Sequence, residues 1–270
     1  MTTRRRKEPR TRKEQRAESR GQRAKSKERR AESKEQRFTP AERRLIARLN
    51  TPAKVQRYLN ALPYNTEPPP GRATLRSFRG VLRHHTAHCL EAALFAATVL
   101  EHHGYPPLLI SFESIDELDH VIFVYQSRSM VHRRWSRVGR ESPARALWGS
   151  VARSRDPGLH GRKPVFASPR ALAASYVDPY VDLTGRVEAF AVFDLRALDS
   201  YDWRLSSTNV WKVERVLLAL RHRPLKMAEA RFQKFRRMYR DFKQAHPDQK
   251  PLFYAERNRW TPIPAEFLVR

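Results

Sequence analysis

The chain has 270 residues, and its 54 Lys and Arg against 28 Asp and Glu give a formal net charge of +26 at pH 7. A charge of this sign and size favours contact with nucleic acid, ribosomes or other acidic partners. The single cysteine excludes an internal disulfide framework, no apolar run reaches the roughly 18 to 20 residues of a membrane span, and the N-terminus lacks the apolar segment of a signal peptide. We therefore expect a soluble, cytoplasmic protein.

The first 37 residues are strongly basic and contain no Val, Ile, Leu, Phe, Tyr or Trp. They carry sixteen Lys or Arg and six Asp or Glu, which accounts for ten of the 26 excess positive charges. A segment without apolar side chains to bury cannot offset the conformational entropy that ordering costs. We predict that residues 1–37 form a disordered basic arm, for which nucleic-acid binding and a purely solubilising role both remain open.

Two short helices are predicted to follow, over residues 38–49 and 51–62. Each opens on a Thr-Pro pair, with the threonine as N-cap and the proline at the first helical position. The run TEPPPG, residues 66–71, then breaks the helical pattern. Ordered structure is therefore expected to begin near residue 38.

A longer helix is predicted from Thr86, as its N-cap, to about His102. Apolar residues lie nearly all round this helix, so we expect it to be buried. Three strand-like runs come next: PLLISFES (107–114), HVIFVYQ (120–126) and LWGSVARS (147–154). The basic insertion between the last two, residues 127–146, is longer than a hairpin loop needs to be.

The last part of the chain is predicted to contain a helix (168–180), a strand (186–195) and two more helices (209–220 and 224–247). A helix followed by neighbouring strands and then further helices favours an α+β fold, with helices packed on a mostly antiparallel sheet. We divide the chain into the arm 1–37, an α+β domain over 38–200, and a helical C-terminal extension over 201–270 that packs on the core.

Cys89 lies in the first turn of the long predicted helix. The positive end of a helix dipole and a nearby imidazole both lower the pKa of a thiol, and the thiolate is the nucleophilic form. Backbone N–H groups at the helix start could also hold an oxyanion. His120, at the beginning of an apolar strand, is the candidate base.

Two other interpretations of Cys89 remain open. A lone cysteine is often an ordinary buried thiol that behaves as a small apolar side chain. It could also ligate zinc together with His84, His88 and His120, although no CxxC or HExxH motif accompanies these residues.

The stretch HCLEAALFAATVLEHHGYPPLLI (88–110) resembles the cysteine-bearing helix of the transglutaminase-like branch of the papain-like cysteine protease superfamily. DHVIFVY (119–125) resembles the histidine-bearing strand of that family, and the segment before Cys89 resembles its helical lead-in. The resemblance covers about residues 52–157. It implies a papain-like core in which the cysteine-bearing helix packs on an antiparallel sheet, and a Cys-His-Asp site.

The third member of that site is where the sequence departs from the family pattern. The family usually places an Asp soon after a Trp on the strand next to the histidine strand. Here Trp148 begins the strand and Ala152 occupies the corresponding place. Asp156, which precedes a proline, is the predicted third member, and Asp178 and Ser154 are the alternatives.

The resemblance implies a thiol-dependent acyl-transfer enzyme. Cys89 would attack an amide or ester carbonyl, His120 would act as general base and then general acid, and Asp156 would orient the imidazole. A peptide or protein amide is the expected substrate, no cofactor is expected, and hydrolysis and transfer to an amine both remain open. The alternative is a noncatalytic transglutaminase-like scaffold that binds nucleic acid or ribosomes through its basic segments.

Overall fold

The computed structural model describes residues 37–67, 73–115, 120–127 and 146–268. By its internal contacts the chain divides into two compact units, Met1–Ala47 and Arg48–Arg270. Most of the predicted basic arm, and most of the predicted basic insertion after residue 127, lie outside the described residues. Within those residues, no helix combines the length and apolar character needed to cross a membrane.

In the first unit, helix α2 (Pro40–Arg48) begins where the sequence predicts. The hydroxyl of Thr39 accepts a hydrogen bond from the backbone N–H of Glu42, and the Glu42 carboxylate accepts one from the N–H of Thr39. This reciprocal capping box, with proline at the first helical position, fixes the start of the helix.

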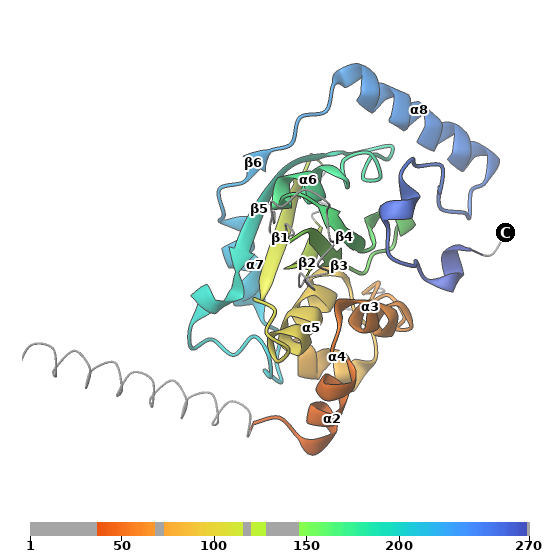
Figure 1. Cartoon of the computed structure of the whole chain (residues 1–270). Coiled ribbons are helices and arrows are strands. Elements are labelled where there is room, and N and C mark those ends of the chain that lie inside the picture. The colour runs from red at the N-terminus through yellow and green to blue at the C-terminus, as the bar shows by residue number, and fades with distance from the viewer. Residues whose placement is uncertain (1–36, 68–72, 116–119, 128–145, 269–270) are drawn as a thin grey trace, which may run out of the picture. The chain divides into compact units, whose positions relative to one another are not determined.

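The second unit contains six helices and a six-stranded sheet among the described residues (Figure 1). The helices are α3 (Pro52–Asn60), α4 (Phe78–His84), α5 (Cys89–Glu101), α6 (Pro169–Ala174), α7 (Trp211–Leu218) and α8 (Glu229–Ala245). The strands are β1 (Leu108–Ser114), β2 (Val121–Gln126), β3 (Trp148–Val151), β4 (Arg162–Phe166), β5 (Val187–Asp194) and β6 (Arg223–Pro224). Short 3-10 turns occupy Pro157–Leu159, Leu195–Leu198, Arg257–Arg259 and Ala265–Phe267.

Every neighbouring pair in the sheet is antiparallel, and the strand order is β4-β3-β2-β1-β5-β6. Helices pack on this sheet: α5 contacts β1 and β2, α3 contacts β3, and α6 contacts β3 and β4 (Figure 1). The α+β class predicted from the sequence is therefore confirmed. Alternate residues of β1 and β2, including Ile110 and Ile122, form one core cluster with Leu172 and Tyr176 from the α6 region.

Helix α5 starts two residues later than predicted, because His88 and not Thr86 is its N-cap. The Thr86 hydroxyl instead accepts a hydrogen bond from the Arg76 guanidinium at 2.5 Å. His88 is the N-cap, and its backbone N–H donates to the Glu91 carboxylate at 3.1 Å. Cys89 is consequently the first residue of the helix, where backbone N–H groups have no partner within the helix. All residues from Leu90 to Leu100 are buried, as the apolar pattern indicates.

Candidate active site around Cys89

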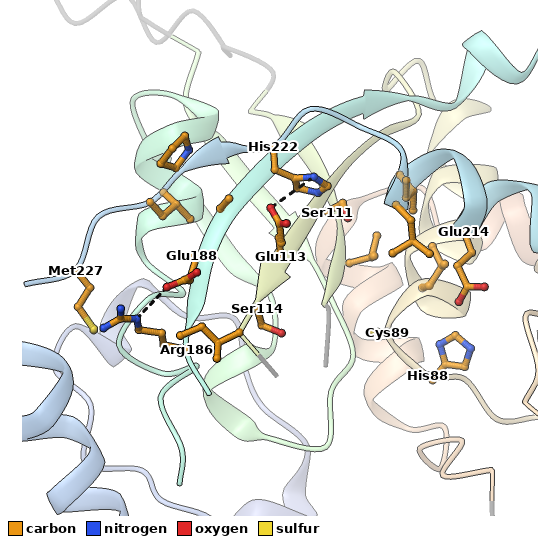
Figure 2. A pocket seen from close by; sticks show the side chains of 18 of the residues that line it. His88, Cys89, Ser111, Glu113, Ser114, Arg186, Glu188, Glu214, His222 and Met227 are labelled. Carbon is orange, nitrogen blue, oxygen red and sulfur yellow. Dashed lines mark hydrogen bonds and ion pairs between the residues drawn. The ribbon is translucent and has the colours of Figure 1, made fainter. Parts of the chain in front are cut away.

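Cys89 lies where two cavities meet. The larger, of about 1490 Å³, runs from the start of α5 along β1 and β5 to α7, and Figure 2 shows His88 and Cys89 on its wall. The smaller, of about 250 Å³, is lined by Tyr64, Cys89 and His120 together with residues 154–159 and side chains from later loops. Cys89 is half-buried and lines both cavities.

Two imidazoles act on this thiol. Burial alone would raise the pKa of Cys89, but hydrogen bonds from His120 and His88, and the positive charge of both rings, hold it well below the ordinary value. The sequence predicts one of these partners, His120. The other, His88, was considered only as a possible zinc ligand, and its place next to Cys89 in the chain is the signal that points to it.

His120 is buried at the entrance to β2, where its ring stacks on Phe112 and lies 6.1 Å from the ring of Tyr176. Its Nε2 lies 3.0 Å from the carbonyl oxygen of Leu159. A carbonyl oxygen can only accept a hydrogen bond, so Nε2 must carry a hydrogen. Nδ1 is therefore the ring nitrogen that is left to exchange a proton with the thiol of Cys89.

The loop that carries Leu159 is held by Arg162, whose side chain is fully buried. Its guanidinium donates to the carbonyl oxygens of His160 at 2.7 Å and Gly158 at 2.6 Å. The guanidinium also lies over the Tyr176 ring, 4.0 Å from the ring centroid. Burial lowers the pKa of Arg162 to about 10, so the group stays charged at neutral pH. Arg162 thus fixes the carbonyls on both sides of Leu159 in the chain.

Asp156, the predicted third member of the site, lines the smaller cavity with Cys89 and His120. Its carboxylate forms an ion pair with Lys250 at 2.8 Å, whereas the His120 ring is oriented by the Leu159 carbonyl. Ser154, one alternative, lines the same cavity, and its hydroxyl accepts from the backbone N–H of Asp156. Asp178, the other alternative, is paired with Arg231.

Tyr64 lines the smaller cavity with Cys89 and His120, and a backbone bridge to Ala87 holds its segment in place. Burial raises the pKa of Tyr64, and so does the charge of the Cys89 thiolate, while Arg155 and a hydrogen bond with the Cys89 backbone act in the opposite direction. The phenol therefore stays neutral at physiological pH.

The described part of the chain contains no group of three or more His, Cys, Asp or Glu side chains placed to hold a metal ion. His84, considered above as a possible zinc ligand, is exposed in the last turn of α4. No protein-family model matches this sequence, and no curated protein matches it at a significant level.

Acid is expected to destabilise the fold through His160, which is fully buried beside the Leu159 carbonyl. Its Nε2 donates to the Ser154 carbonyl at 3.0 Å, and among the described residues its Nδ1 has no hydrogen-bond partner. Burial, followed by the charge of Arg153, lowers the pKa of His160 to about 3. Between that value and the ordinary value of about 6.5, the unfolded chain binds a proton that the folded chain does not.

The free energy of unfolding should therefore fall as the pH falls from 6.5 towards 3, by up to about 1.4 kcal/mol per pH unit from this group. Urea unfolding at a series of pH values would measure the slope. His160→Gln keeps a side-chain N–H donor but does not titrate, so its slope should be shallower over that range. An identical slope in the two proteins would show that His160 is not the group responsible.

Proposed function

We propose that the chain is a thiol-dependent acyl-transfer enzyme in which Cys89 is the nucleophile and His120 the general base and acid. The observation that carries this proposal is that Cys89, the first residue of α5, and the buried His120 line the same cavity. This chemistry requires a thiol with a lowered pKa, a base within reach and backbone N–H groups that can bind an oxyanion.

The proposed reaction begins with transfer of the thiol proton to Nδ1 of His120. The Cys89 thiolate then attacks the carbonyl carbon of an amide, and the Cys89 N–H stabilises the resulting oxyanion. His120 gives its proton to the departing amine, which leaves a thioester on Cys89. Water or a second amine attacks this thioester while His120 accepts the proton of the attacking group, and the thiolate is released.

We infer further that the core is transglutaminase-like and papain-like. Three features support this: a buried helix that begins with the cysteine, an antiparallel strand that begins just after the histidine, and packing of this helix on this strand. The proposed site differs from the family pattern in its third member, because a backbone carbonyl orients the histidine. In our proposal, Leu159 thus fills the role that the sequence assigned to Asp156.

The two cavities that meet at Cys89 suit transfer as well as hydrolysis. An acyl donor can occupy the larger cavity while the attacking group approaches the thioester through the smaller one. The larger cavity has room for a peptide segment, and its wall combines apolar side chains such as Leu217 and Leu225 with carboxylates such as Glu113 and Glu188 (Figure 2). A peptide or protein amide is the substrate class that we propose.

The first test is detection of an acyl-enzyme. The purified chain is mixed with the activated ester 4-nitrophenyl acetate and then with a library of amide-containing peptides, and its intact mass is measured. Because Cys89 is the only cysteine, any thioester must lie on it. We expect an adduct that hydroxylamine removes and that Cys89→Ala lacks. An unmodified chain, with a thiol that also resists alkylation at pH 7, would contradict the proposal and favour a noncatalytic nucleic-acid-binding scaffold.

A further inference from the structure

The two histidines at Cys89 have different surroundings. Nε2 of His120 bonds a neutral carbonyl, that of Leu159. Nε2 of His88 lies 2.9 Å from the carbonyl oxygen of Thr74 and also 3.6 Å from a carboxylate oxygen of Glu91. A carboxylate favours the protonated form of a neighbouring imidazole, whereas a carbonyl oxygen does so only as a hydrogen-bond acceptor.

Glu91 is fully buried but well supplied with hydrogen bonds. It accepts from the backbone N–H groups of Arg76 and His88 and from the side chains of Thr74 and Asn65, at 2.8 to 3.1 Å. A buried carboxylate with this many donors is stable as the anion. The position is fixed as well, because Glu91 lies in the first turn of α5. His88 therefore has a permanent negative neighbour.

The same tautomer argument applies to His88 as to His120. The Thr74 carbonyl oxygen only accepts, so Nε2 of His88 carries a hydrogen. Burial alone would lower the pKa of His88. The hydrogen bond to Cys89, the charge of the thiolate and the charge of Glu91 outweigh burial and raise it to about 9.

We propose that His88 is a second catalytic histidine that keeps its proton throughout the cycle and stabilises the Cys89 thiolate as a fixed cation, with Glu91 as the positioning counter-ion. The site is then a row of four groups of alternating charge: Glu91, His88, Cys89 and His120. His120 carries out the proton transfers, and His88 keeps the thiol ionised even when His120 has lost its proton. The role of His88 in turnover rests on the proposed function. The pairing of the His88 cation with the Cys89 thiolate does not require a substrate.

Other charged groups surround this row. Arg76, which precedes α4, approaches Glu91 at 3.8 Å and shares its charge. Glu67 and Glu214 of α7 line the larger cavity together with His88, and Figure 2 shows Glu214 at the same end of the cavity as His88. Arg155 and Asp156 line the smaller cavity on the other side of the thiol and partly offset each other.

The test is the apparent pKa of the Cys89 thiol, measured from the pH dependence of its alkylation by iodoacetamide. His88→Asn should raise this value by about 1 to 3 pH units, the range expected when one close opposite charge is lost. His120→Asn should raise it by a similar amount, and the double variant should bring it to about 8.5 or above, because burial then acts without the two cations. Glu91→Gln, which removes the charge but keeps an amide in place, should shift it in the same direction.

A merely structural role of His88 as the helix N-cap makes a different prediction. His88→Ser, a good N-cap without charge, would then behave as the wild type, whereas our proposal expects a raised thiol pKa. Thermal unfolding of each variant checks that the fold is kept. If only His120→Asn raises the thiol pKa, the second-cation inference fails and the proposed function stands. If neither His88→Asn nor His120→Asn raises the thiol pKa, both the second-cation inference and the proposed function fail.

Discussion

Replacing His120 with asparagine is expected to slow thioester formation on Cys89 by about 10² to 10⁴-fold, the usual contribution of a positioned general base and acid. Asparagine fits the volume and can still donate to the Leu159 carbonyl, so the loss measures proton transfer rather than packing. The measurement is the single-turnover rate of acylation by the best substrate found, or by 4-nitrophenyl acetate.

His84→Asn is the matched control, because His84 is exposed at the end of α4 and lines neither cavity. Its acylation rate should equal that of the wild type. A His120→Asn protein that acylates within a few-fold of the wild-type rate would show that the histidine is not the proton carrier, even if the thiol remains reactive.

Arg162→Met is expected to destabilise the fold by about 1 to 3 kcal/mol. The guanidinium is fully buried, and its removal leaves the carbonyl oxygen of Gly158 without its donor and that of His160 with only the Tyr176 hydroxyl. Each unsatisfied buried acceptor costs about 1 to 3 kcal/mol. Urea unfolding at pH 7 measures the loss, because methionine fills much of the volume without supplying any donor.

Arg162 also holds the loop that carries Leu159, so its replacement should have a second effect. Acylation of Cys89 should slow in Arg162→Met at temperatures where the protein is still folded, because the carbonyl that orients His120 is no longer fixed. Arg170→Met is the control: Arg170 is exposed and donates to a single carbonyl, that of Pro224. A stability loss no larger than that of Arg170→Met would contradict the anchoring role.

The fold was predictable where local patterns are strong. Helix starts with a proline at the first position correctly predicted where α2, α3 and α6 begin. Apolar runs predicted both ends of β1, β2 and β5 to within one or two residues. The sequence missed β4, and it indicated α4 only through the resemblance of the segment before Cys89 to a helical lead-in. Arg162, at the start of β4, is a fully buried charged residue. Because arginine is rarely buried, the sequence alone predicts a surface position for it. The rings of Tyr176 and Trp260, from distant segments of the chain, cover the Arg162 guanidinium.

The sequence predicted two side chains of the candidate site, those of Cys89 and His120. It did not predict the group that orients His120. Cys89 at a helix start and His120 before an apolar strand are visible as residue types in suitable places, and the structure brings them together. Asp156 was expected because carboxylates usually orient such histidines. The observed contact is with the Leu159 carbonyl, and backbone atoms are the same at every position, so no residue type signals them.

Because the atom that orients His120 belongs to the main chain, no substitution at position 159 can remove it. The side chain there is free to vary as far as this contact is concerned, and what must be inherited is the length and path of the segment between β3 and β4. Deleting or inserting a single residue in that segment would displace the carbonyl and leave every candidate catalytic side chain unchanged. Relatives of this protein are therefore better sought by the spacing from Trp148 to Arg162 than by an aspartate in a motif.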